Sequence, residues 1–271
     1  MAIYPVSWIA AATALVLLSG CTIGEHSGDI SQLAPPSSGQ PLPSPSRARL
    51  SHVDPAPPTP HPPGTVCPTG RPPQPRRLGP DAAVTARVDA AWQRIERWLR
   101  VNAPRTYASL GPPATADEIA ATERFMSVGL PADLVASLRR HGGARTADVR
   151  AAFRLPPYYV LASLDGIRTG WRTRCQIVER GGYPPGPWWH PKYVPFAESL
   201  GGDCLVVDQR PKGGGRVGEH SHEDQVFFDR RPASVAELLE ATAKALEDGG
   251  PYGHVRPRAG ADGVLDWEII R

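Results

Sequence analysis

This chain of 271 residues has few cysteines, little excess of either charge and no long apolar run near its start. Four cysteines are too few for the disulfide scaffold of a small secreted domain. Over 81–271, 25 basic residues nearly balance 24 acidic ones, so no basic stripe for nucleic acid is expected. The apolar stretch at 8–18 is too short to span a bilayer. These absences exclude a cysteine-rich mini-protein and a membrane-spanning segment at 8–18.

The first twenty residues have the features of a secretory signal. The apolar stretch at 8–18 suits the core of a signal peptide. The run Leu18-Ser19-Gly20-Cys21 resembles the bacterial lipobox, which implies cleavage before the cysteine and lipid on its sulfur and new amine. One departure is that no Lys or Arg precedes Arg47, whereas a signal normally starts with a basic region. We expect a signal peptide at 1–20 and a lipid-anchored protein on the extracytoplasmic face of the cell membrane. The alternative is an apolar N-terminus that frays or packs on the domain.

Proline dominates the segment that follows. Residues 34–80 contain 16 of the 32 prolines and show neither helical nor strand periodicity. Proline fixes φ and favours polyproline II geometry, with a rise of about 3.1 Å per residue. We therefore expect the lipidated cysteine and a disordered, semi-rigid spacer over 21–80.

The four cysteines have different expected roles. If Cys21 is acylated, three remain, so at least one is a free or intermolecular thiol. Cys67 lies in the spacer and is not expected in the core. Cys175 falls on a helical pattern and Cys204 on a strand pattern, so both are expected as buried thiols. A disulfide between these last two is the alternative.

The remaining residues, 81–271, are long enough to bury a full core and are expected to form one domain. Apolar periodicity predicts five helices, the first of which carries Trp92 and Trp98 inward. Their predicted starts are at or just after Asp81, Thr115, Pro131, Ser163 and Ser234, with capping boxes completed by Glu118 and Glu237. Period-two patterns predict short strands at 158–161, 193–196, 204–207, 216–220 and 225–228. Local strands between groups of helices predict an α+β fold.

Short motifs follow one another in a characteristic order along this domain. The first half carries Gly111-Pro112-Pro113-Ala114-Thr115 and Leu130-Pro131-Ala132-Asp133-Leu134. The second half carries Trp188-Trp189-His190-Pro191, Val194-Pro195-Phe196, Gly202-Asp203-Cys204-Leu205 and Gly215-Arg216-Val217-Gly218. In this order they resemble the SUKH superfamily over 81 to about 249. The resemblance implies one mainly antiparallel sheet with flanking helices, and neither a reaction nor a cofactor.

The resemblance also implies what the domain does. SUKH relatives include fungal regulators of cell-wall glucan synthesis and bacterial immunity proteins that neutralise toxins. We expect a non-enzymatic protein-binding module, tethered to the outer face of the membrane, that acts in toxin immunity or envelope defence. Its expected partner is an unknown protein, such as a toxin domain. The alternative is a lipoprotein that regulates or scaffolds cell-envelope or cell-wall synthesis. Immunity proteins usually act in the cytoplasm, so the signal and spacer depart from the commonest bacterial pattern.

The polar clusters predict no metal and no catalytic site. His220 and His222 would share one side of a strand, as zinc ligands can, but a polar hairpin turn is the preferred interpretation. Asp203 and Asp208 flank a short strand and are interpreted as structural rather than as an acid/base pair. The glycines at 213–215 are interpreted as a flexible turn, because a P-loop has another order and precedes a helix.

Trp188, Trp189 and His190 form the candidate partner-binding site. They follow a proline-rich loop at 183–187, and exposed aromatics on such a loop make contacts at low entropic cost. Two adjacent indoles cannot both point into one core from a strand, which leaves room for at least one to be accessible. The preferred interpretation of the pair is that both pack under the loop as a local plug.

Overall fold

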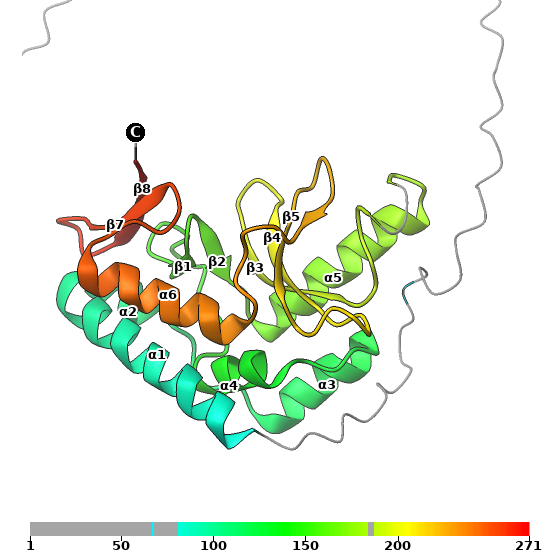
Figure 1. The fold of residues 1–271 in the computed structure, drawn as a ribbon, viewed down its shortest axis with the longest axis horizontal. Helices are drawn as coiled ribbons and strands as arrows, with labels where there is room; N and C mark the ends of the chain where they lie inside the picture. The colour runs from blue at the N-terminus through cyan, green and yellow to red at the C-terminus, as the bar shows by residue number, and fades with distance from the viewer. Residues whose placement is uncertain (1–66, 68–80, 184–186, 271) are drawn as a thin grey trace, which may run out of the picture. The chain divides into compact units, whose positions relative to one another are not determined.

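The structure is a computed structural model that describes residue 67 and the ranges 81–183 and 187–270, all within the unit 56–271. The predicted signal peptide, Cys21 and most of the spacer lie outside the described residues, so what was predicted for them stays a prediction. The described chain is α+β, as predicted, with a six-stranded and a two-stranded antiparallel sheet beside its helices (Figure 1). No helix in the described ranges is both long enough and apolar enough to cross a membrane.

Four helices precede the sheet: α1 (Ala82–Asn102), α2 (Pro104–Ser109), α3 (Ala116–Met126) and α4 (Ala132–Arg140). Three of them start where the caps predicted. Asp81 accepts hydrogen bonds from the first turn of α1, Thr115 and Glu118 form the capping box of α3, and α4 follows Pro131. The six-residue α2 was not predicted, because one short turn after a proline carries no apolar periodicity.

The strands of the larger sheet follow one another in chain order. They are β1 (Arg154–Leu155), β2 (Tyr159–Leu161), β3 (Tyr193–Glu198), β4 (Cys204–Asp208), β5 (Val217–His220) and β6 (Val226–Phe227). Every neighbouring pair is antiparallel, which confirms a meander and adds β1 to it. Helix α5 (Leu164–Glu179) connects β2 to β3, begins at the Ser163 cap, and packs on β3 and α3. The glycines at 213–215 lie in the turn between β4 and β5, as predicted.

Helix α6 (Val235–Asp248) lies along α1 (Figure 1), where Arg87 and Glu240 form an ion pair with a 2.8 Å N–O distance. Its predicted cap is present, since the Ser234 hydroxyl accepts a hydrogen bond from the Glu237 amide at 3.1 Å. The second half of the predicted capping box differs. The Glu237 carboxylate accepts from the Ala233 amide, one residue before the cap, at 2.7 Å.

The chain continues into a hairpin of β7 (Val255–Ala259) and β8 (Leu265–Ile269), which was not predicted. The indole Nε1 of Trp267 donates to the Arg154 carbonyl at 3.0 Å, and the Leu265 amide donates to the Thr106 hydroxyl at 2.9 Å. These bonds attach the hairpin to β1 and to α2. Arginine and proline interrupt the apolar alternation of β7, which hides its strand pattern.

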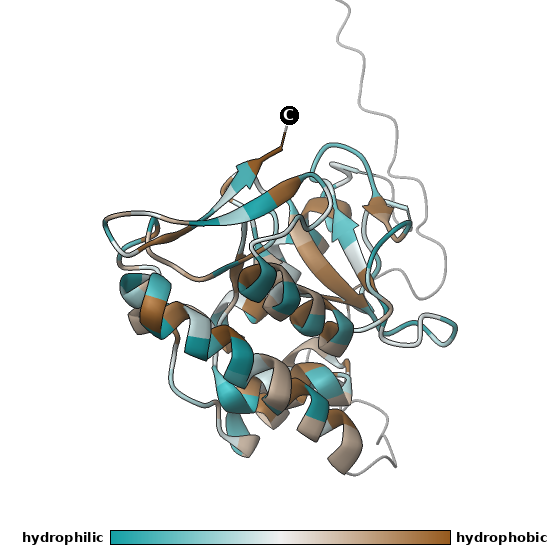
Figure 2. Cartoon of the chain, turned by 60° about the vertical axis from the view of Figure 1, so that its left-hand side comes forward, coloured by the Kyte–Doolittle hydropathy of each residue, from teal (hydrophilic) through white to brown (hydrophobic). Residues whose placement is uncertain are grey.

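The core lies between the helices and the central strands. Figure 2 shows a hydrophobic strand at the centre, whereas the helices carry both hydrophobic and hydrophilic residues. Strands β3 and β4 are buried along nearly their whole length. Trp92 is fully buried, as expected, but Trp98 is only partly buried at the margin of the core, so the expectation of two inward indoles was wrong for Trp98.

Cys67 overturns the expectation that no cysteine of the spacer reaches the core. It is buried and forms a disulfide with Cys175 of α5, 108 positions later. Neither a buried thiol at Cys175 nor a Cys175–Cys204 disulfide is present, whereas Cys204 is the buried free thiol that was expected. Local composition does not predict this pairing, because a covalent bond can fix a segment that has no apolar face of its own.

Candidate functional site

The two adjacent indoles of the predicted binding site are both buried. Trp188 and Trp189 are 2% and 1% exposed, which confirms the local plug and shows that the prediction of the two indoles as a partner contact was wrong. The reason is that 187–188 form a turn rather than a continuous strand, so that consecutive side chains can enter the protein interior. The Trp188 ring stacks on Tyr183 with centroids 4.5 Å apart, and its Nε1 donates to the His222 carbonyl at 3.0 Å.

His190, the third residue of that predicted site, is partly exposed. Its Nδ1 accepts a hydrogen bond from the Lys192 amide at 3.1 Å. Burial, together with the nearby charge of Arg210, lowers the pKa of His190. Of the three residues proposed for partner binding, only His190 therefore reaches the surface, and its Nδ1 is already bonded to the Lys192 amide.

A partly buried ion pair lies beside Trp189. The Arg174 guanidinium of α5 donates to both carboxylate oxygens of Glu198 at 2.9 Å and to the Gly202 carbonyl at 2.9 Å. A Cβ at position 170 would lie 2.4 Å from Glu198 Oε1, so glycine there lets the carboxylate approach α5. Burial raises the pKa of Glu198 despite the guanidinium. This pair links α5 to β3 and has the features of a structural contact.

The two histidines of the predicted hairpin have different environments. His220 is fully buried, and its Nδ1 accepts a weak hydrogen bond from Arg174 Nε at 3.4 Å. Burial and the Arg174 charge lower the pKa of His220 to about 3, so the imidazole is neutral at physiological pH. His222 is half-exposed, and its Nδ1 lies 2.8 Å from Asp203 Oδ1. Within the described ranges, no three His, Cys, Asp or Glu side chains gather as metal ligands would.

Asp203 and Asp208 lie at opposite ends of β4 and do not form a pair. Asp208 is fully buried and accepts two hydrogen bonds from Arg210, at 2.9 and 2.8 Å. Burial opposes its ionisation, but the bonds from Arg210 and Arg216 outweigh burial and lower the pKa of Asp208. A Cβ at Gly213 would lie 2.3 Å from the Asp208 carboxyl carbon, so the glycine turn closes over this carboxylate. Both aspartates act as turn-fixing groups, as the sequence indicated.

Exposed apolar side chains gather at a groove that the sequence did not reveal. Tyr158, Leu200 and Ile269 are 47%, 79% and 69% exposed and line one pocket of about 570 Å³. We call it the apolar groove. It lies between the β1–β2 loop, the β3–β4 turn and β8, and Figure 2 shows hydrophobic residues at the end of β8. The polar groups that line it include Arg154, Asp203, His254 and Asp266. Leu200 in a glycine turn and Ile269 in an unpredicted hairpin gave no sequence signal for this surface.

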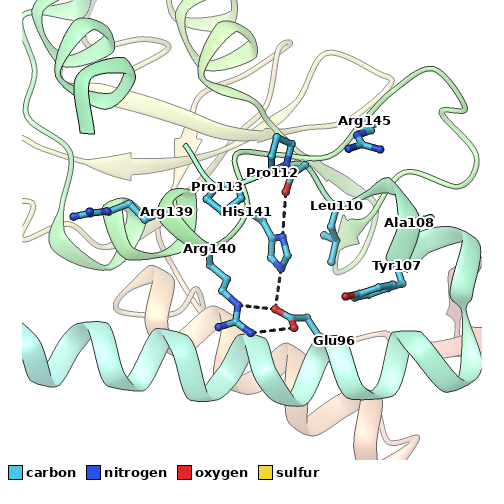
Figure 3. A pocket seen from close by; sticks show the side chains of 11 residues that line it. Glu96, Tyr107, Ala108, Leu110, Pro112, Pro113, Arg139, Arg140, His141 and Arg145 are labelled. Carbon is cyan, nitrogen blue, oxygen red and sulfur yellow. Dashed lines mark hydrogen bonds and ion pairs between the residues drawn. The ribbon is translucent and has the colours of Figure 1, made fainter. Parts of the chain in front are cut away.

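A second pocket, of about 540 Å³, contains a carboxylate held by basic groups (Figure 3). We call it the Glu96 pocket. The buried Glu96 of α1 accepts from Arg140 at 2.7 and 3.0 Å and from Arg100 at 2.9 Å. Burial opposes ionisation, but the bonds from Arg140 and His141 outweigh it and lower the pKa of Glu96. His141 lies between Glu96 Oε1, 2.9 Å from its Nε2, and the Gly111 carbonyl, 3.2 Å from its Nδ1.

Comparison with known proteins gives one family match and two curated relatives. The cell wall biosynthesis/cell cycle regulator smi1 of Schizosaccharomyces pombe is 23% identical over 192 residues, which cover 62% of this chain and 38% of the relative. A glucan synthesis regulatory protein of Neurospora crassa is 24% identical over 174 residues, which cover 49% of this chain and 33% of the relative. The chain thus spans between 33% and 38% of the length of these relatives. Residues 113–241, from just before α3 into α6, match the SMI1 / KNR4 family (SUKH-1). This match supports the resemblance of the domain to the SUKH superfamily.

Proposed function

We propose that this protein is a non-enzymatic protein-binding module that docks a partner in the apolar groove. The observation that carries the proposal is the gathering of three exposed apolar side chains, Tyr158, Leu200 and Ile269, at one groove. Contiguous exposed apolar surface with a polar rim marks protein contact sites. The occupant is a segment of another protein that presents apolar side chains. Because Trp188 and Trp189 are buried, the contact belongs to the groove and not to the indoles.

We further propose that the module is held at the extracytoplasmic face of the membrane by lipid on Cys21. The Cys67–Cys175 disulfide supports export, because disulfides persist in oxidising compartments and are rare in the cytosol. The lipobox-like run Leu18-Ser19-Gly20-Cys21 and the proline-rich spacer supply the anchor and the distance from the bilayer.

The biological role proposed first is toxin immunity or envelope defence, in which the domain occludes a partner protein such as a toxin domain. A second candidate, regulation or scaffolding of cell-envelope or cell-wall synthesis, has an observation of its own in its favour. Both curated relatives are named as regulators of wall or glucan synthesis. The two roles predict different partners for the same groove.

The groove is tested by charge substitutions at its exposed apolar residues. Leu200→Asp and Ile269→Asp are expected to weaken capture of the partner by at least about tenfold, because each places a charge in an apolar contact. The measurement is quantitative capture from cell-envelope extract by the mature chain. Val101→Asp, at a residue that is equally exposed but lies outside the groove, is the matched control and should retain binding.

The result of this capture also separates the two roles. A toxin domain retained by the wild type and lost by both groove variants supports immunity, and a wall-synthesis protein supports the regulatory role. Equal retention by the wild type and both groove variants rejects the groove as the docking surface.

The anchor is tested by replacement of the lipidated cysteine. Cys21→Ala is expected to move the protein from the membrane fraction to the soluble fraction, because the two lipid attachments then cannot form. Fractionation followed by mass spectrometry of the mature N-terminus measures this. An intact Met1 in the mature wild type, or unchanged fractionation of the variant, contradicts the lipoprotein assignment.

A further inference from the structure

The Glu96 pocket carries more positive charge than its own carboxylate balances. Arg100 and Arg140 both bond to Glu96, so one acid faces two guanidinium groups. The pocket is also lined by Arg139 and Arg145, which are exposed and make no ion pair within the described ranges. Asp89 of α1 is a further acid that acts on Arg140. Four arginines against two acids leave an excess of two positive charges.

His141 is the third side chain, after Arg100 and Arg140, that contacts the Glu96 carboxylate. Its two ring nitrogens face the Glu96 carboxylate and the Gly111 carbonyl, and both of these groups are hydrogen-bond acceptors. The Glu96 carboxylate is therefore fully occupied by donors from the protein itself and does not neutralise the two unpaired arginines at the rim.

The shape of the pocket indicates what kind of anion fits. Figure 3 shows Arg139 and Arg145 on opposite sides of His141, well separated from each other. Apolar surface from Leu110, Pro112 and Pro113 lies in the same pocket. A single phosphate is best held by donors that converge on one point, whereas Arg139 and Arg145 lie apart. Two separated guanidinium groups with apolar surface suit a ligand that carries several carboxylates on an extended chain.

We propose that the Glu96 pocket binds an acidic peptide segment of a partner protein. Arg139 and Arg145 contact carboxylates of the segment, and the proline and leucine surface packs against the aliphatic parts of its side chains. The Glu96 cluster keeps Arg140 and His141 in place beneath them. The pocket shares no lining residue with the apolar groove, so this second docking surface is independent of the first.

The test uses the mature full-length chain and a fluorescein-labelled deca-glutamate peptide, with binding measured by fluorescence anisotropy at low salt. The variant Arg139→Glu/Arg145→Glu is expected to weaken binding by about tenfold, because it replaces two attractive contacts by two repulsive ones. The matched control is Arg180→Glu/Arg258→Glu. It changes the net charge by the same amount at two exposed arginines that lie outside the pocket and have no ion pair in the part of the chain that the structure describes. Less than twofold loss is expected for the control.

Further arms separate the sources of negative charge. Inorganic phosphate and vesicles containing phosphatidylglycerol are used as competitors. Neither is expected to displace the peptide from the wild type. Arg139→Lys/Arg145→Lys is expected to recover part of the binding, since charge is kept but the planar fork is lost. Equal loss in the pocket and control variants, no loss in either, or preferential binding of phosphate or vesicles overturns the proposal. Unchanged unfolding midpoints show that the variants are folded.

Discussion

Replacement of Trp92 by alanine is expected to lower the free energy of unfolding by about 3–5 kcal/mol. The indole is fully buried, and its Nε1 donates to the Ser137 hydroxyl at 3.0 Å, so that it joins α1 to α4. Its ring also lies against His141 and Phe153, with centroids 4.9 and 5.4 Å away. Alanine leaves a large cavity and a buried hydroxyl without this donor. Guanidinium unfolding of the mature chain measures the loss.

The control for this prediction is on the same helix. Trp98→Ala removes an indole that is only partly buried, so its cost is expected to be well below that of Trp92→Ala. An unchanged midpoint for Trp92→Ala contradicts the packing of α1 on α4 described above. Equal losses for the two variants contradict the difference in burial.

The disulfide is expected to have the second large effect. Cys67→Ser opens a loop that spans 108 positions, and the chain-entropy account assigns a loop of roughly this length about 4.7 kcal/mol. Allowing for structure that remains in the unfolded chain, we expect a loss of about 2–5 kcal/mol in the free energy of unfolding. Unfolding with and without a reducing agent measures it.

Reduction provides the matched comparison for this loss. Reduced wild type should unfold at nearly the same denaturant concentration as Cys67→Ser, and the reducing agent should have no effect on the variant. The buried free thiol Cys204 should remain unlabelled by alkylating agent until the chain unfolds. Rapid alkylation of Cys67 in the native, oxidised wild type contradicts the disulfide.

Local signals predicted much of the fold. The Thr115–Glu118 capping box and the Ser163 and Ser234 caps each fixed a helix start, because a cap is recognised by residues three positions apart. The short apolar runs of β3 and β4 likewise identified the centre of the sheet. Each cap residue bonds to an amide only three positions later in the sequence.

Features that depend on distant contacts were missed or reversed. Cys67 bonds to a residue 108 positions away, which spacer composition cannot indicate. The two indoles at 188 and 189 were predicted as a partner contact, but the backbone turns there and both enter the interior. The hairpin of β7 and β8 is stabilised by Trp267 and Leu265 through bonds to β1 and α2 rather than by a strong pattern of its own.

The two candidate sites also depend on contacts between residues that are far apart in the sequence. The apolar groove combines a loop, a turn and the last strand, and the Glu96 pocket combines α1, α2 and the end of α4. Each residue taken alone is an ordinary surface apolar or basic side chain. Only the folded chain shows that Leu200 and Ile269, or Arg139 and Arg145, line the same pocket.

Hydrogen–deuterium exchange of the mature chain, free and bound to its captured partner, tests the central claim most directly. Docking in the apolar groove predicts slower exchange on binding at the β3–β4 turn, at 199–203, and in β7 and β8, because these segments supply the groove. Exchange at 187–190, where the indoles are already buried, should change little. Protection confined to 187–190, or to helices remote from the groove, would contradict the account.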